Sequence, residues 1–128
     1  SNLSMIYFGK LYFFILYNMI SWHDFEKVEM RVGTILEVQD FPKANKPAYQ
    51  LTIDFGSELG IKKSSAQITK RYSKKDLLGK QIIAVVNFPK KQIADFMSEC
   101  LVLGSVGEEN DIVLLTSDVP VENGLRIG

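Results

Sequence analysis

The 128-residue chain has very few of the residue types that build metal sites and covalent active sites. It contains one histidine, His23, and one cysteine, Cys100. Zinc sites usually combine several His or Cys ligands, so this chain cannot assemble one alone, and a single thiol cannot form an internal disulfide. No P-loop, G-x-G-x-x-G or G-x-S-x-G pattern occurs, and Cys100 lies in an apolar stretch where a buried, inert thiol is expected. The sequence therefore predicts a protein that is not an enzyme and that holds neither a metal nor another cofactor.

The chain also lacks an apolar run long enough to span a membrane. The longest run, MIYFGKLYFFILYNMI at residues 5–20, is interrupted by Lys10 and is shorter than the roughly 20 residues of a transmembrane helix. It has neither the basic start nor the small-residue cleavage site of a signal peptide. We therefore expect no membrane insertion. For residues 1–18 two interpretations stay open: a tag remnant or upstream extension before a natural start at Met19, or an apolar segment covered by a partner subunit.

The net charge is zero, with 15 basic and 15 acidic residues, but the two signs are separated along the chain. Residues 62–91 hold nine of the basic residues and one acid, Asp76, which gives this segment, the basic block, a net charge of +8. Residues 19–61 carry seven acids against four bases, and residues 92–128 carry seven against one. Because a surface field depends on where charges lie, the basic block favours a polyanionic ligand such as nucleic acid.

Short segments with strand periodicity dominate the rest of the chain. Apolar and polar residues alternate at 30–40, where Gly33 predicts a bend or bulge, and most regularly at 49–55. Further strands are expected at 63–69, 81–88, 99–104 and 111–116. The continuous apolar run at 81–88 is typical of a central strand covered on both faces.

Two short helices are expected between these strands. Ser21 and Asp24 form a weak capping box before a helical pattern, and Ser73 can cap a helix that ends near Gly79. Five or six strands with one helix between the third and the fourth predict an all-β protein with short helices. We expect an OB-fold, a five-stranded barrel, with an N-terminal helical extension, in one domain at residues 19–128.

The basic block overlaps the surface that OB-folds use for ligands, the outward face of strands 2 and 3 with the adjoining loops. RNA recognition needs cations for phosphates, polar groups for 2′-hydroxyls and a ring for stacking, and the NFPKK loop at 87–91 adds a ring and two cations. Solvated lysines beside a short helix are the alternative. The RNA-binding residues predicted from this pattern are Lys63, Ser65, Gln67, Lys70, Arg71, Asn87, Lys90 and Lys91.

A second cluster favours a different ligand. The stretch IADFMSE at 93–99 places Phe96 and Met97 close to Phe88. These side chains either complete the core or, partly exposed, form an adaptable apolar groove for an extended peptide. The predicted peptide-binding residues are Phe88, Phe96 and Met97.

Several stretches resemble a known family. MRVGTI, AYQLTIDFG, YSKKDLLGKQIIAVVNF and PVENGLRIG are similar to the tRNA-binding domain appended to some methionyl- and phenylalanyl-tRNA synthetases. The motifs SSAQITKRY and VVNFP resemble most strongly the stand-alone, secretion-associated, chaperone-like members, the CsaA group. The resemblance covers residues 19–128.

This resemblance implies an OB-fold core, a cytoplasmic homodimer formed partly through the terminal segments, and two activities. One is the binding of tRNA, and the other is the binding of unfolded or precursor polypeptides for export. It also implies that Asn87 and Ser98 occupy polar positions of the RNA surface. Departures at Gln92, Asp95 and Cys100-Leu101 from the family pattern predict weaker attraction for phosphates or an altered loop.

Two hypotheses therefore lead, with a third behind them. The first is a non-enzymatic protein that binds tRNA or other structured RNA, and the second is a peptide-binding chaperone for unfolded precursor proteins. RNA affinity falls steeply with salt, whereas apolar peptide binding does not. The third is a structural dimer module that recruits another protein.

Overall fold

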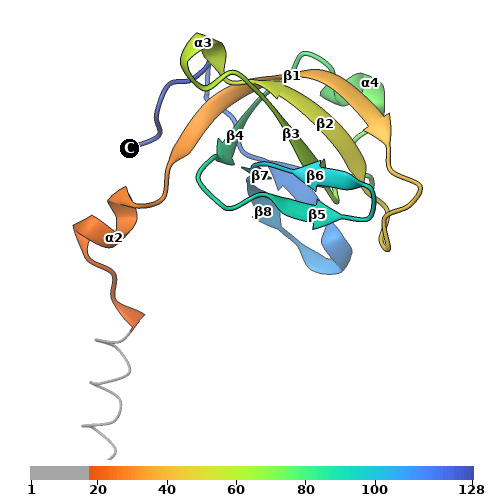
Figure 1. The fold of residues 1–128 in the computed structure, drawn as a ribbon, viewed down its shortest axis with the longest axis horizontal. Helices are drawn as coiled ribbons and strands as arrows, with labels where there is room; N and C mark the ends of the chain where they lie inside the picture. The colour runs from red at the N-terminus through yellow and green to blue at the C-terminus, as the bar shows by residue number, and fades with distance from the viewer. Residues whose placement is uncertain (1–17) are drawn as a thin grey trace, which may run out of the picture.

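The computed structural model describes residues 18–128. The expectation for residues 1–18 therefore lies outside the described residues, except at Asn18. Helix α2 (Trp22–Glu26) opens the described chain with the expected capping box, because Ser21 Oγ accepts from Asp24 N–H and Asp24 accepts from Ser21 N–H. This helix buries none of its residues and stands outside the barrel, at the lower left of Figure 1.

A five-stranded antiparallel sheet in the order β3-β2-β1-β4-β7 forms most of the barrel. Its strands are β1 (Met30–Asp40), β2 (Tyr49–Asp54), β3 (Ile61–Ala66), β4 (Gln81–Val85) and β7 (Leu101–Val102). The hairpins β5 (Lys91–Ile93) with β6 (Phe96–Ser98), and β8 (Gly104–Val106) with β9 (Ile112–Leu114), complete it. The predicted OB-fold barrel with short helices is confirmed.

Short helices and turns join the strands. Helix α3 (Gly56–Leu59) links β2 to β3, helix α4 (Lys74–Leu77) links β3 to β4, and the 3-10 turn η1 (Glu108–Asn110) links β8 to β9. Ser73 and Asp76 form the second capping box, and Gly79 follows α4 with a positive φ of 82°, as the sequence indicates. Among residues 18–128, no helix is both long and apolar enough to cross a membrane.

Hydrogen bonds between β3 and the β6–β7 connection close the barrel. Lys63 C=O accepts from Glu99 N–H at 2.7 Å, and Ser64 Oγ donates to Cys100 C=O at 3.0 Å. Inside lies a core whose fully buried members come from several elements: Ile35, Leu51, Ile53, Phe55, Leu77, Ile82 and Ala84. A second, smaller core of Phe41, Ala48 and Phe96 fills one end.

Gly33 has a different role from the one its sequence context predicts. The irregular register of β1 against β2 falls between Ile35 and Glu37, so the bulge lies beyond Gly33, which pairs regularly with Ile82. A Cβ on Gly33 would lie 2.7 Å from both Ile53 Cγ2 and Phe55 Cε1. The glycine is therefore required by close packing of the core.

The C-terminal segment completes the edge of β1. Gly124 N–H donates to Val32 C=O, and Val32 N–H donates to Leu125 C=O. Thr34 and Gln81 side chains both bond to Asn123. The C-terminus therefore lies beside the start of β1, close to α2 (Figure 1).

Candidate nucleic-acid interface

A groove of about 570 Å³ opens between the end of β3, the loop after β4 and the β6–β8 segment. Its walls are mainly apolar, and the floor includes the barrel residues Ala66 and Cys100. The apolar wall residues are Ile68, Ile93, Leu101, Val102, Leu103, Val106 and Ile112.

Five of the predicted site residues line this groove: Ser65, Gln67, Phe88, Lys91 and Ser98. Phe88 is the exposed ring among them, with 55% of its surface open. Lys91 is exposed and makes no ion pair among residues 18–128. The groove therefore brings a free ring, a free cation and polar side chains to one surface.

The buried side chain of Ser98 joins strand β6 to strand β3. It is 9% exposed, and its Oγ accepts from Ser65 N–H at 3.1 Å. The bond ties β6 to β3 at the floor of the groove, so this hydroxyl is already engaged in the free protein.

Four of the nine cations in the basic block are paired with acids from the flanking segments. The pairs are Lys70–Glu109, Arg71–Asp111, Lys74–Asp40 and Lys90–Glu99. Acidic residues from the segments before and after the basic block therefore neutralise part of its charge in the folded protein. The positive field of this face is correspondingly weaker than the count of charges in the sequence predicts.

The Arg71–Asp111 pair has the best geometry of the four. Arg71 Nε lies 2.9 Å from Asp111 Oδ1, and Arg71 Nη2 lies 2.8 Å from Asp111 Oδ2. These hydrogen bonds lower the pKa of Asp111 and raise that of Arg71. Both groups therefore stay charged near neutral pH.

Glu99 sits between two predicted RNA contacts. It accepts from Lys63 N–H at 3.0 Å, and its other oxygen lies 3.6 Å from Lys90 Nζ. The Lys63 ammonium itself has no ion-pair partner in the described part of the chain and is exposed. Lys63 and Lys91 are therefore the predicted phosphate contacts whose charge is not matched by an acid.

The Asn87 side chain is occupied by the N-terminal junction. Its Oδ1 accepts from Glu29 N–H at 3.1 Å, and its Nδ2 donates to Lys27 C=O at 2.6 Å. Val86 N–H also donates to Glu29 C=O. Asn87 therefore fastens the end of β4 to the link between α2 and β1, directly before Phe88 enters the groove.

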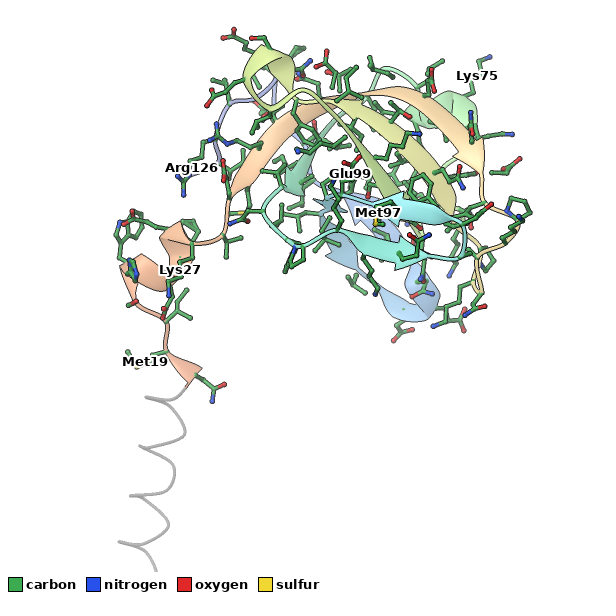
Figure 2. All side chains as sticks on the ribbon, in the orientation of Figure 1. Met19, Lys27, Lys75, Met97, Glu99 and Arg126 are labelled. Atoms are coloured by element: carbon green, nitrogen blue, oxygen red, sulfur yellow. The ribbon has the colours of Figure 1, made fainter. Side chains whose placement is uncertain are left out.

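The three residues predicted to bind peptide are not on one surface. Phe96 is 8% exposed and packs against Phe41, with ring centroids 5.4 Å apart, so it follows the alternative in which it completes the core. Met97 is 43% exposed and points outward from β6 beside Glu99 (Figure 2). Phe88 alone of the three lines the groove.

The apolar wall of the groove is the feature that the sequence did not indicate. Leu101 and Val106 are exposed at 48% and 79%. Leu101 and Val106 belong to β7 and β8, which have only two and three residues. Strands this short show no periodicity, so the sequence could not indicate that these side chains face Ser65 and Gln67. The buried thiol was indicated correctly, since Cys100 is 6% exposed, and this burial raises its pKa to about 12.

No group of three His, Cys, Asp or Glu side chains within residues 18–128 could hold a metal ion. His23 is exposed on α2.

Comparisons with known proteins agree with this description. Residues 30–126 match the family described as "Putative tRNA binding domain". The methionine–tRNA ligase of Thermococcus onnurineus (strain NA1) is 35% identical over 108 residues, which are 84% of this chain and 14% of that protein. The chain thus spans about a seventh of the length of this curated relative.

Two solved structures are similar over nearly their whole length. The chaperone CsaA of Bacillus anthracis str. Ames is 52% identical with a TM-score of 0.82, covering 86% of this chain and 99% of that one. The CsaA chaperone protein of Picrophilus torridus is 55% identical with a TM-score of 0.81, covering 86% and 100%. From the family match over residues 30–126 and these similarities, the chain belongs to the tRNA-binding-domain family.

Proposed function

We propose that this protein binds tRNA or another structured RNA through the groove and its basic rim, without catalysis. The observation that carries the proposal is that the exposed Phe88 ring lines the groove together with the polar Gln67 and with Lys91, which has no ion-pair partner among residues 18–128. A ring accepts a base by stacking, a lysine meets phosphate, and an amide bonds to a 2′-hydroxyl or a base edge. Membership of the tRNA-binding-domain family supports the same ligand.

The predicted RNA-binding residues fall into groups according to whether their polar atoms already have partners within the protein. Lys63 and Lys91 meet phosphates directly, with Ser65 and Gln67 as polar contacts. Lys70, Arg71 and Lys90 reach phosphates only after leaving their carboxylate partners. Ser98 and Asn87 position the surface, because their polar atoms are already bonded within the protein.

The test is the affinity of labelled total tRNA for three variants, measured by fluorescence anisotropy at one low salt concentration. Phe88→Ala is expected to weaken binding about tenfold, since base stacking on a ring contributes roughly 1–3 kcal/mol. Lys91→Glu is expected to weaken it by a similar factor. Lys75→Glu is the matched control, because Lys75 is an exposed lysine on α4, away from Met97 and Glu99 (Figure 2). Equal affinities for Lys91→Glu and Lys75→Glu would remove the groove from the proposal.

A peptide-binding chaperone is the second candidate, favoured by the apolar wall of the groove. Leu101, Val106 and Phe88 offer exposed apolar surface of the kind that an extended, unfolded chain buries. The similar CsaA structures are chaperones. In this case the protein would act on precursor polypeptides before export, and Phe88→Ala would weaken the binding of an unfolded peptide with little dependence on salt.

We also infer that the protein works as a cytoplasmic homodimer. Met19, Ile20 and Trp22 around α2 are exposed at 62%, 71% and 70%. A helix that exposes such side chains next to the barrel's C-terminal segment fits an interface between two copies. The cytoplasm is where tRNA and precursor polypeptides meet such a protein.

A further inference from the structure

The turn between β8 and β9, residues Gly107–Asp111, points its carboxylates at two cations of the basic block. Asp111 forms two parallel hydrogen bonds with Arg71, and Glu109 Oε2 lies 3.8 Å from Lys70 Nζ. Lys70 and Arg71 follow the groove residue Ile68 closely in the chain, and Asp111 directly precedes the groove residue Ile112. The two ion pairs therefore lie at one end of the groove.

The backbone of this turn is shaped to present the carboxylates. Glu109 and Asn110 both have left-handed φ angles, 54° and 60°, a conformation that costs energy for residues other than glycine. Gly107 N–H donates to Asp111 C=O at 2.9 Å, and Asp111 N–H donates to Glu108 C=O at 3.1 Å. These two hydrogen bonds close the turn on itself and stabilise its backbone.

A carboxylate and a phosphate use the arginine side chain in the same way, through two parallel N–H···O bonds. Asp111 therefore occupies the donors with which Arg71 would otherwise bind a phosphate. The pair remains accessible to a ligand, since the side chains of Arg71 and Asp111 are 51% and 34% exposed. Exposed ion pairs contribute little to stability, so a ligand can separate this one.

We propose that Asp111, assisted by Glu109, competes with ligand phosphate for Arg71 and Lys70 and so sets the selectivity of the groove. This proposal rests on the proposed RNA-binding function and adds its regulation. A ligand with one isolated phosphate does not displace the internal carboxylates. A folded RNA presents several closely spaced phosphates, and it replaces both internal pairs at once while Lys63 and Lys91 hold it nearby.

The test compares Asp111→Asn with a variant of equal charge change. Asp118→Asn is the control, because Asp118 is an exposed acid that makes no ion pair within residues 18–128. Asp111→Asn is expected to tighten tRNA binding about threefold more than the control does. The slope of log affinity against log salt should stay close to the wild-type slope, because the RNA already contacts Arg71 in the wild type and the substitution only removes the competing carboxylate.

Two further variants separate competition at Arg71 from a general change of charge. In an Arg71→Gln background, Asp111→Asn should tighten binding no more than Asp118→Asn does. Glu109→Gln should tighten binding in the wild-type background by a smaller factor than Asp111→Asn. Glu109 is 89% exposed, so this change leaves the fold intact even if Asp111→Asn disturbs the turn.

The outcomes for this inference and for the RNA-binding function differ. If wild-type protein binds tRNA and both turn variants behave like Asp118→Asn, the competition is refuted and the RNA-binding function stands. If neither the wild type nor any variant binds tRNA at low salt, both proposals fail.

Discussion

At the scale of single residues, the absence of a side chain at Gly33 is as important as the large side chains around it. A Cβ there would meet Ile53 and Phe55 at 2.7 Å, and both neighbours are fully buried. Gly33→Ala is therefore expected to lower the free energy of unfolding by about 1–3 kcal/mol, as overpacking does. Urea denaturation would measure this change. Gly128→Ala is the control, because a Cβ at Gly128 would have no neighbour within 4 Å. Equal stability of the two variants would contradict the packing described here.

Cys100 gives a second prediction at this scale. Its thiol is 6% exposed and has a pKa of about 12, because burial disfavours the thiolate. The thiolate is the reactive form, so the folded protein should react with a thiol reagent at pH 8 about a thousandfold more slowly than the denatured chain. The absorbance of the released dye measures the rate, and Cys100→Ser supplies the blank. Fast labelling of the folded protein would show that Cys100 is accessible.

At the scale of elements, Asn87 links the placement of α2 to the loop that carries Phe88. Asn87→Ala removes the acceptor of Glu29 N–H, so the exchange of that amide should accelerate about fivefold, the equivalent of one hydrogen bond of about 1 kcal/mol. Hydrogen exchange followed by NMR measures this rate. Asn87→Asp keeps the acceptor and loses only the donor to Lys27 C=O, so it should preserve the protection of Glu29. An unchanged exchange rate of the Glu29 amide in Asn87→Ala would mean that the hydrogen bond between Asn87 and Glu29 does not form in solution.

Element prediction from sequence succeeded where the signal was local. Ser21 with Asp24, and Ser73 with Asp76, predicted helix starts that the structure confirms. Strands β1 and β2 followed clear periodicity, and β4 followed a continuous apolar run. Two of the predicted strands are shorter in the structure, since β3 ends at Ala66 and not at Thr69, and β4 ends at Val85 and not at Phe88.

The hairpin of β5 and β6 was missed because each strand has only three residues, too few to show a period. Its turn uses Ala94 with a φ of 52° in place of the usual glycine or asparagine, so the turn gave no signal either. The four ion pairs of the basic block could not be predicted, since they join residues far apart in sequence. The apolar wall of the groove was missed for the same reason, because its residues lie far in the sequence from Ser65 and Gln67, which they face.

At the scale of the whole molecule, the exposed α2 region predicts self-association. Trp22→Glu should convert a dimer into a monomer, because it places a charge where apolar surface would be buried. Sedimentation velocity distinguishes the two states. His23→Glu, at an adjacent exposed position on the same helix, should leave the dimer intact. A wild-type protein that sediments as a monomer would contradict the dimer.

The arrangement of charge over the molecule provides the most direct test of the proposed RNA binding. Although its net charge is zero, Lys63 and Lys91 are exposed and have no ion-pair partner within residues 18–128, so an RNA that they contact would release counterions. The decisive measurement is the anisotropy of labelled tRNA and of a labelled unfolded peptide between roughly 50 and 200 mM salt. RNA binding predicts that tRNA affinity falls about tenfold or more across this range, with a log–log slope of about −2 or steeper. Binding of the peptide alone, with little response to salt, would contradict the account and assign the groove to polypeptides.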